Sequence, residues 1–156
     1  MPADNDDKKA KRRARRDLRA GKQPSTAAGE FVREEIDHVR AGKHGARSPQ
    51  QAIAIGLSKA RRAGVPVAPP KRGKTSERTR KAAKRDTATG QGRRKPRAPS
   101  HRRAVATQHA LEREPHRSAS HAALGAHAHE AAARRSAAER SAAAKRAART
   151  RARHAR

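Results

Sequence analysis

The chain contains no cysteine, tryptophan or tyrosine, and its single phenylalanine is Phe31. The lack of cysteine excludes disulfides, thiolate zinc sites and thiol catalysis, and the scarcity of aromatic rings excludes stacking platforms for unpaired bases. Acidic residues are also few: 14 Asp and Glu stand against 41 Lys and Arg, which gives a net charge of +27 over 156 residues. A chain this positive repels itself and attracts polyanions.

Long hydrophobic runs are missing as well. No stretch approaches the roughly 18 apolar residues of a membrane-spanning helix, and residues 1–7 lack the apolar segment of a secretory signal. We therefore expect a cytoplasmic protein with no membrane partner. Large apolar residues are too few for a conventional core, and a highly charged chain of this kind is typically disordered. The sequence predicts a mostly disordered protein with α-helical elements.

Residues 30–65 are the one segment patterned like a folded unit. Val32, Ile36 and Val39 repeat at the spacing of one helical face. Because two glycines, Gly42 and Gly45, follow this stretch, we expect the first helix to end near residue 40.

The second helix of this segment has clear start and stop signals. Ser48 and Gln51 have the spacing of a capping box, and Pro49 falls at the first helical position. Gly64 is placed to end the helix in a left-handed conformation. The sequence therefore predicts a short helix-loop-helix at about 30–64. Its two helices are expected to pack through Val32, Ile36, Val39, Ile53 and Leu57.

The rest of the chain is basic and of low complexity. We expect residues 1–29 to form a disordered basic tail and residues 66–103 to form a basic linker rich in proline and glycine. A short surface helix over 76–86 is compatible with that linker. Residues 104–156 consist largely of Ala, Arg, His and Ser, and their alanine content favours a helix-prone tail with arginines along one side.

Positive charge is concentrated in three clusters, at 8–22, 71–103 and 134–156. No segment carries an obvious set of base-reading residues, so sequence-independent contact with phosphates is the expected binding mode. DNA is the favoured partner, although phosphate contacts alone discriminate poorly between DNA and RNA. The residues expected to contact phosphates are Lys8, Lys9, Lys11, Arg12, Arg13, Arg15, Arg16, Lys71, Arg72, Lys74, Arg93, Arg94, Lys95, Arg134, Arg135, Lys145, Arg146 and Arg149.

Histidines and carboxylates are the residue types here that could bind a metal or act as catalysts. His121, His127 and His129 are the closest histidine group, but His127 and His129 do not share a helical face. Glu34 and Glu35 lie on a short helix with no pocket to shift their pKa values. The sequence therefore predicts no enzyme, no metal site and no cofactor.

Three stretches carry a resemblance to known proteins: GEFVREE at 29–35, GKHG at 42–45 and SPQQAIAIGLSKARRAG at 48–64. They resemble a family of small, lysine-rich bacterial proteins built around a domain of unknown function. Gln50 stands where that family commonly has a basic residue, and Lys59 where it usually has Glu. Since the family has no assigned activity, the resemblance implies no catalytic or binding residue. The tail at 104–156 resembles linker-histone tails in composition alone.

These observations favour sequence-nonspecific nucleic-acid binding by a nucleoid-associated, histone-like protein. In this hypothesis the basic flanks neutralise phosphates, while the helix pair self-associates or docks on a partner. The alternative is a hydrophilic stress or interaction protein whose helix pair docks on a protein partner. A ribosome- or RNA-associated factor is a third possibility, because the charge pattern fits any nucleic acid.

Overall fold

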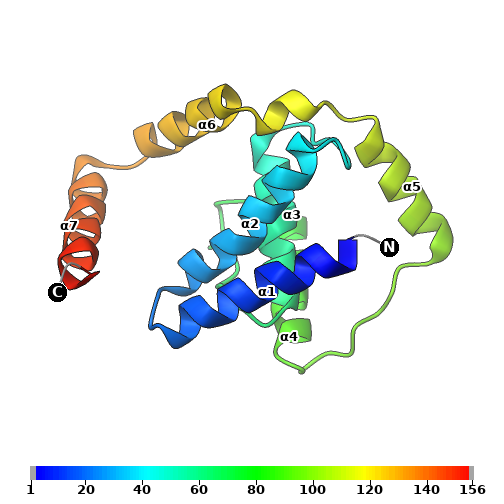
Figure 1. Ribbon diagram of the computed structural model, residues 1–156, viewed down its shortest axis with the longest axis horizontal. Helices are drawn as coiled ribbons and strands as arrows, with labels where there is room; N and C mark the ends of the chain where they lie inside the picture. Colours follow the sequence, from blue (N-terminus) through cyan, green and yellow to red (C-terminus); the bar gives the residue numbers. More distant parts are fainter. Residues whose placement is uncertain (1–2, 155–156) are drawn as a thin grey trace. The chain divides into compact units, whose positions relative to one another are not determined.

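A computed structural model describes residues 3–154, which form seven α-helices and one 3-10 helix (Figure 1). The helices belong to two units, the first ending at Ser120 and the second beginning at His121. The expectation of a mostly disordered chain is therefore wrong. The elements are α1 (Ala3–Arg19), α2 (Pro24–Arg40), α3 (Pro49–Arg62), α4 (Glu77–Gly90), α5 (His101–Glu112), η1 (His116–Ala119), α6 (His121–Ala133) and α7 (Ala137–His154).

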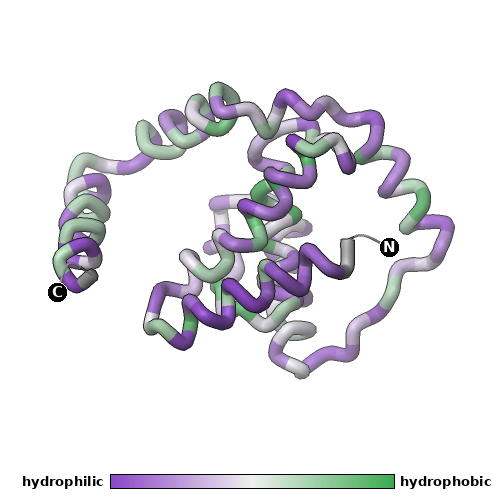
Figure 2. Tube along the Cα trace, viewed as in Figure 1, coloured by the Kyte–Doolittle hydropathy of each residue, from purple (hydrophilic) through white to green (hydrophobic). Residues whose placement is uncertain are grey.

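The first unit folds because its helices pack through alanine. A rule that counts only Leu, Ile, Val and Phe does not detect this core. Alanine buries little area, but its small side chain lets helices approach closely enough for extensive dispersion contact. Figure 2 shows the consequence for α1, whose trace is hydrophilic along most of its length. The buried members of this core are Ala10, Ala14, Ala27, Ala28, Phe31, Ala60 and Val65.

Helix α1 lies within the segment expected to be a disordered tail, and that expectation is wrong for the described residues. Ala10, Ala14 and Leu18 are spaced by four residues, so they share one helical face. This face joins the alanine core together with α2 and α3. An ion pair between Arg13 Nη2 and Glu34 Oε2 at 3.5 Å also links α1 to α2.

Helices α2 and α3 approach each other closely at Gly56. A Cβ atom at this position would lie 2.6 Å from the Cα of Val32, so only glycine fits beneath α2. The residues predicted to pack the two helices against each other differ in how far they are buried. Val39 is fully buried, Ile36 and Leu57 pack against the buried cores, and Val32 and Ile53 are half-buried.

The ends of α3 follow the local sequence signals. The Ser48 side chain accepts a hydrogen bond from the Gln51 backbone N–H at 3.3 Å, and the Gln51 side chain accepts one from the N–H of Arg47 at 2.8 Å. Gly64 has a φ of +93°. The backbone N–H of Val65 donates to the carbonyl of Ala60 at 3.0 Å, which closes the helix end.

A second core lies at the other end of the helix pair and includes η1. Val39, Ala46, Ala52 and Ala119 are fully buried there. The loop after α2 is tied to the distant segment by a hydrogen bond from Ala46 N to Pro115 O at 3.2 Å, and Arg40 Nε donates to Ala119 O at 2.8 Å. The first unit therefore extends well beyond the helix pair.

Replacing Arg40 with glutamine should lower the free energy of unfolding by about 1 kcal/mol, because the variant lacks a partly buried hydrogen bond to the Ala119 carbonyl. Urea unfolding followed by circular dichroism would measure the change. Arg33→Gln is the matched control, since Arg33 is exposed and its nearest carboxylate, Asp37, is 3.9 Å away. Equal effects of the two changes would contradict a specific role for the Arg40 hydrogen bond.

Between residues 3 and 154, no helix combines the length and apolarity required to cross a bilayer.

Candidate nucleic-acid interface

One face of α1 carries four basic side chains, Lys9, Arg12, Arg13 and Arg16. These residues line a shallow hollow of about 390 Å³ with no other residue type in its wall. Their spacing of three or four residues places them on the same side of the helix. We call this set the α1 stripe.

The members of the α1 stripe differ in their internal partners. Arg13 pairs with Glu30 and Glu34 of α2, and Lys9 Nζ lies 3.4 Å from Asp6 Oδ1. Arg12 and Arg16 are exposed, and among the described residues neither has an acidic partner within ion-pair distance. These two guanidinium groups are therefore available to an external anion.

A second basic surface is a groove of about 1240 Å³ between the ends of α3, α4 and α5. Five of its eleven lining residues are arginines, and the one carboxylate there, Asp86, lies 4.0 Å from the Nε of Arg62. The segment leading to α5 contributes prolines and Ser100. We call this surface the arginine groove. Its arginines are Arg62, Arg85, Arg94, Arg97 and Arg103.

The arginine groove exists because α4 packs tightly on the end of α3. Gly90 lies against the carbonyl of Arg61 so closely that a Cβ atom would overlap it. Arg61 itself is buried, and its guanidinium donates to the carbonyls of Val67 and Ala68 at 3.4 and 3.3 Å. Burial lowers the pKa of Arg61. Arg61 thus holds the chain after α3 in place, while its neighbour Arg62 faces the groove.

Three acidic residues of the first unit, Asp17, Glu34 and Glu35, are buried. Glu35 is 1% exposed, with an oxygen 3.0 Å from Lys59 Nζ, and Asp17 is 3% exposed, 2.8 Å from Lys22. Because carboxylates are withdrawn in this way, the solvent-facing surface is more basic than the composition suggests.

Several of these inward-facing groups have shifted pKa values. Burial raises the pKa of Glu34 and lowers that of His38, which also lies near two lysines. Burial alone would lower the pKa of Lys59, but Glu35 and Asp7 raise it overall. At the edge of the cluster, a hydrogen bond from Lys43 lowers the pKa of Asp6 to about 2. The carboxylates Glu35 and Asp7 thus favour the charged form of Lys59.

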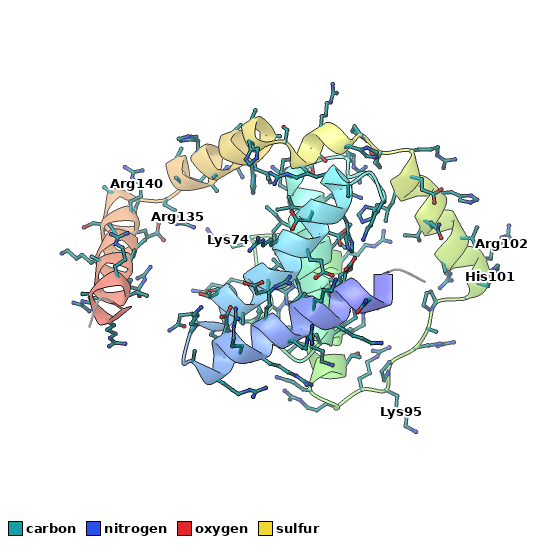
Figure 3. All side chains as sticks on the ribbon, viewed as in Figure 1. Lys74, Lys95, His101, Arg102, Arg135 and Arg140 are labelled. Carbon is teal, nitrogen blue, oxygen red and sulfur yellow. The ribbon has the colours of Figure 1, made fainter. Side chains whose placement is uncertain are left out.

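The structure brings together only part of the predicted phosphate-contact set. Lys8 and Lys11 line a separate hollow near Phe31, and Arg15 is exposed outside the α1 stripe. Of the linker residues, Arg94 lines the arginine groove. Figure 3 shows Lys95 projecting outward from the segment between α4 and α5. The remaining linker residues, Lys71, Arg72, Lys74 and Arg93, are exposed.

In the second unit, the alanine-rich tail forms two helices, α6 and α7, rather than one. Ser136 and Glu139 form a reciprocal cap: Glu139 N donates to Ser136 Oγ at 3.2 Å, and Ser136 N donates to Glu139 Oε2 at 2.9 Å. A new helix, α7, therefore starts at Ala137. The predicted contacts in this unit, Arg134, Arg135, Lys145, Arg146 and Arg149, are all exposed.

Sequence reasoning missed four members of the arginine groove, namely Arg62, Arg85, Arg97 and Arg103. The α1 stripe could have been found from its helical spacing, had α1 been recognised as a helix. The groove could not, because it depends on how α4 docks on α3.

No curated protein and no solved structure matches this chain. A family model matches from within α1 to the segment after α3, so the matched domain includes the first helix as well as the expected helix pair. Residues 7–72 of the chain match the model of DUF6496, a family of unknown function.

Proposed function

We propose that this protein binds duplex DNA without sequence preference, as a cytoplasmic, nucleoid-associated protein of histone-like character. The observation that carries the proposal is the separation of charge: arginines line two exposed surfaces, while three carboxylates of the first unit, Asp17, Glu34 and Glu35, are buried. The resemblance of residues 29–64 to small, lysine-rich bacterial proteins is consistent with this role.

Phosphate contact is the chemistry that these surfaces offer. Arginine presents a planar fork of N–H donors that matches two phosphate oxygens and keeps its charge at any physiological pH. Arg12 and Arg16 are one helical turn apart on α1, and five arginines surround the arginine groove. The chain has no Tyr or Trp, and its one Phe, Phe31, is 2% exposed and cannot stack on a base. The duplex backbone is therefore a better ligand than unstacked bases.

The alternative is docking of a protein partner on the helix pair. The helix pair exposes less apolar surface for such docking than the sequence suggested. Ile55, which lies off the face of α3 that carries Ile53 and Leu57, is half-buried. It lines a cavity together with Ala82 and Ala83 of α4. Within the first unit, α4 therefore covers this side of α3.

Changing Arg12 and Arg16 together to glutamine should weaken DNA binding at 0.1 M salt by roughly tenfold for each phosphate that is no longer neutralised. The slope of log K against log salt should become shallower by about 2. Fluorescence anisotropy with a labelled duplex would measure both quantities.

Arg113→Gln with Arg117→Gln is the matched control, because both residues are exposed and the change in net charge is the same. If the two double variants weaken binding equally, the α1 stripe has no particular role. If the unaltered protein fails to bind duplex DNA at low salt, the proposed function is wrong and protein docking becomes the better hypothesis.

A further inference from the structure

Three residues with metal-ligating side chains meet where α2 ends. Glu35 and His38 are three residues apart on α2, so they share a helical face, and His44 lies in the loop that follows. One ligand atom from each lies within 4.8 Å of the others. The imidazole rings of His38 and His44 meet edge to face, with centroids 6.1 Å apart. Glu35 and His38 are buried, and His44 is partly buried.

The hydrogen bond made by His44 fixes which of its nitrogens can bind a cation. Nδ1 lies 3.1 Å from the carbonyl of Gly45, and since a carbonyl only accepts, Nδ1 must donate. In a neutral ring, Nε2 then has no hydrogen, yet it faces Glu35 Oε1 at 3.3 Å. Two acceptors that face each other at this distance need either a proton or a metal ion between them. Metal-binding histidines commonly donate their other N–H to a backbone carbonyl in this way.

A buried carboxylate oxygen nearby also lacks a hydrogen-bond donor. Oε1 of Glu34 accepts no hydrogen bond and lies 3.9 Å from the Nε2 of His38. Oε2 of Glu35, by contrast, is paired with Lys59 Nζ at 3.0 Å. Glu34 and Glu35 are 7% and 1% exposed. Burying a carboxylate oxygen without a donor is costly, so positive charge at this end of α2 is favoured.

We propose that Glu35, His38 and His44 bind a divalent first-row transition metal, with zinc as the best-suited ion. Two imidazole nitrogens and one carboxylate oxygen are a recognised zinc ligand set. Tetrahedral zinc places its ligands about 3.3 Å apart. The His44–Glu35 pair already has this separation, so modest movement of the third side chain completes the set.

In this proposal a water completes the four-coordinate shell, and the metal stabilises the fold. It joins α2 to the loop that carries Ala46 into the second core. A small domain with few large apolar residues gains stability from such a cross-link. Binding requires Lys59 to release Glu35, and Asp7 remains as its partner at 3.2 Å. This inference is independent of DNA binding.

Titration of the chelator-treated full chain with zinc is expected to show a single tight site and a rise in Tm, since a ligand that binds the folded state stabilises it. His44→Gln should weaken zinc binding at least tenfold. The matched control is His127→Gln with His129→Gln, which removes two histidines of the second unit and should leave this site unchanged. Circular dichroism would verify that both variants retain their helices.

Imidazole nitrogen NMR of the unaltered protein tests the same site without a substitution. Zinc should shift the ring nitrogens of His38 and His44 before those of any other histidine. The proposal is overturned if zinc binds only weaker than about 0.1 mM, or if the first resonances to move belong to His127 and His129. It is also overturned if His44 proves to be an imidazolium that zinc does not displace.

Discussion

Replacing Gly56 with alanine is expected to lower the free energy of unfolding by about 2 kcal/mol or more. The new Cβ would lie 2.6 Å from Val32 Cα and 2.9 Å from Val32 N, and these are backbone atoms that cannot rotate away. Helix α2 would have to move off α3. Alanine's higher helix propensity, worth about 1 kcal/mol over glycine, offsets only part of this cost. Urea unfolding monitored by circular dichroism would measure the difference.

Gly29→Ala is the matched control for this prediction. Gly29 also lies inside a helix, but no atom comes within 4 Å of a Cβ built there. This variant should gain about 0.5–1 kcal/mol, because alanine loses less backbone entropy on folding and has no new neighbour to displace. If both variants are stabilised, α2 and α3 do not cross closely at Gly56.

Local signals in the sequence predicted α3 and its ends well. Ser48 caps the start of the helix, and Gly64 takes the left-handed conformation that stops it. These features depend on residues close together in the chain, so the sequence alone determines them. The capping partner of Gln51 is Arg47 rather than Ser48, a small shift within the same turn.

Helix α1 and the compactness of the first unit were not predicted, for a physical reason. Ala10 and Ala14 repeat at helical spacing, but alanine is common in exposed helices too and gives a weak hydrophobic signal. The decisive contribution is close packing of backbones, as at Gly56 and between Gly90 and Arg61. Composition does not report such contacts, because they depend on which small residues face each other.

Prediction of the candidate interface from sequence has the same limit, because the interface also depends on tertiary contacts. The number of cations can be counted from the sequence, but not which of them face carboxylates in the folded chain. Arg13 and Lys59 are engaged with buried acids, whereas Arg12 and Arg16 are exposed. Ser118 and Ala119 are buried far from the helix pair in sequence, and no local pattern indicated this. Tertiary contacts alone determine which basic side chains pair within the fold and which are available to an external ligand.

Affinity for duplex DNA should fall by about five orders of magnitude between 50 and 200 mM salt. The expectation follows if about ten phosphates are neutralised, which gives a slope of log K against log salt near −9. The two basic surfaces of the first unit and the exposed cations of α7 are together sufficient for this number of contacts. Two unrelated duplexes should bind almost equally at each salt concentration, since phosphates carry no sequence information.

A chain ending at Ala133 tests how much of this electrostatic term comes from the second unit. The truncation removes nine basic residues and one acid, Glu139. The basic residues are Arg134, Arg135, Arg140, Lys145, Arg146, Arg149, Arg151, Arg153 and Arg156. If four of these contact phosphates, the slope should become shallower by about 3–4. Circular dichroism and urea unfolding would verify that the first unit is intact. An unchanged slope would restrict binding to the first unit. Affinity insensitive to salt, or a strong preference for one duplex, would rule out the mechanism.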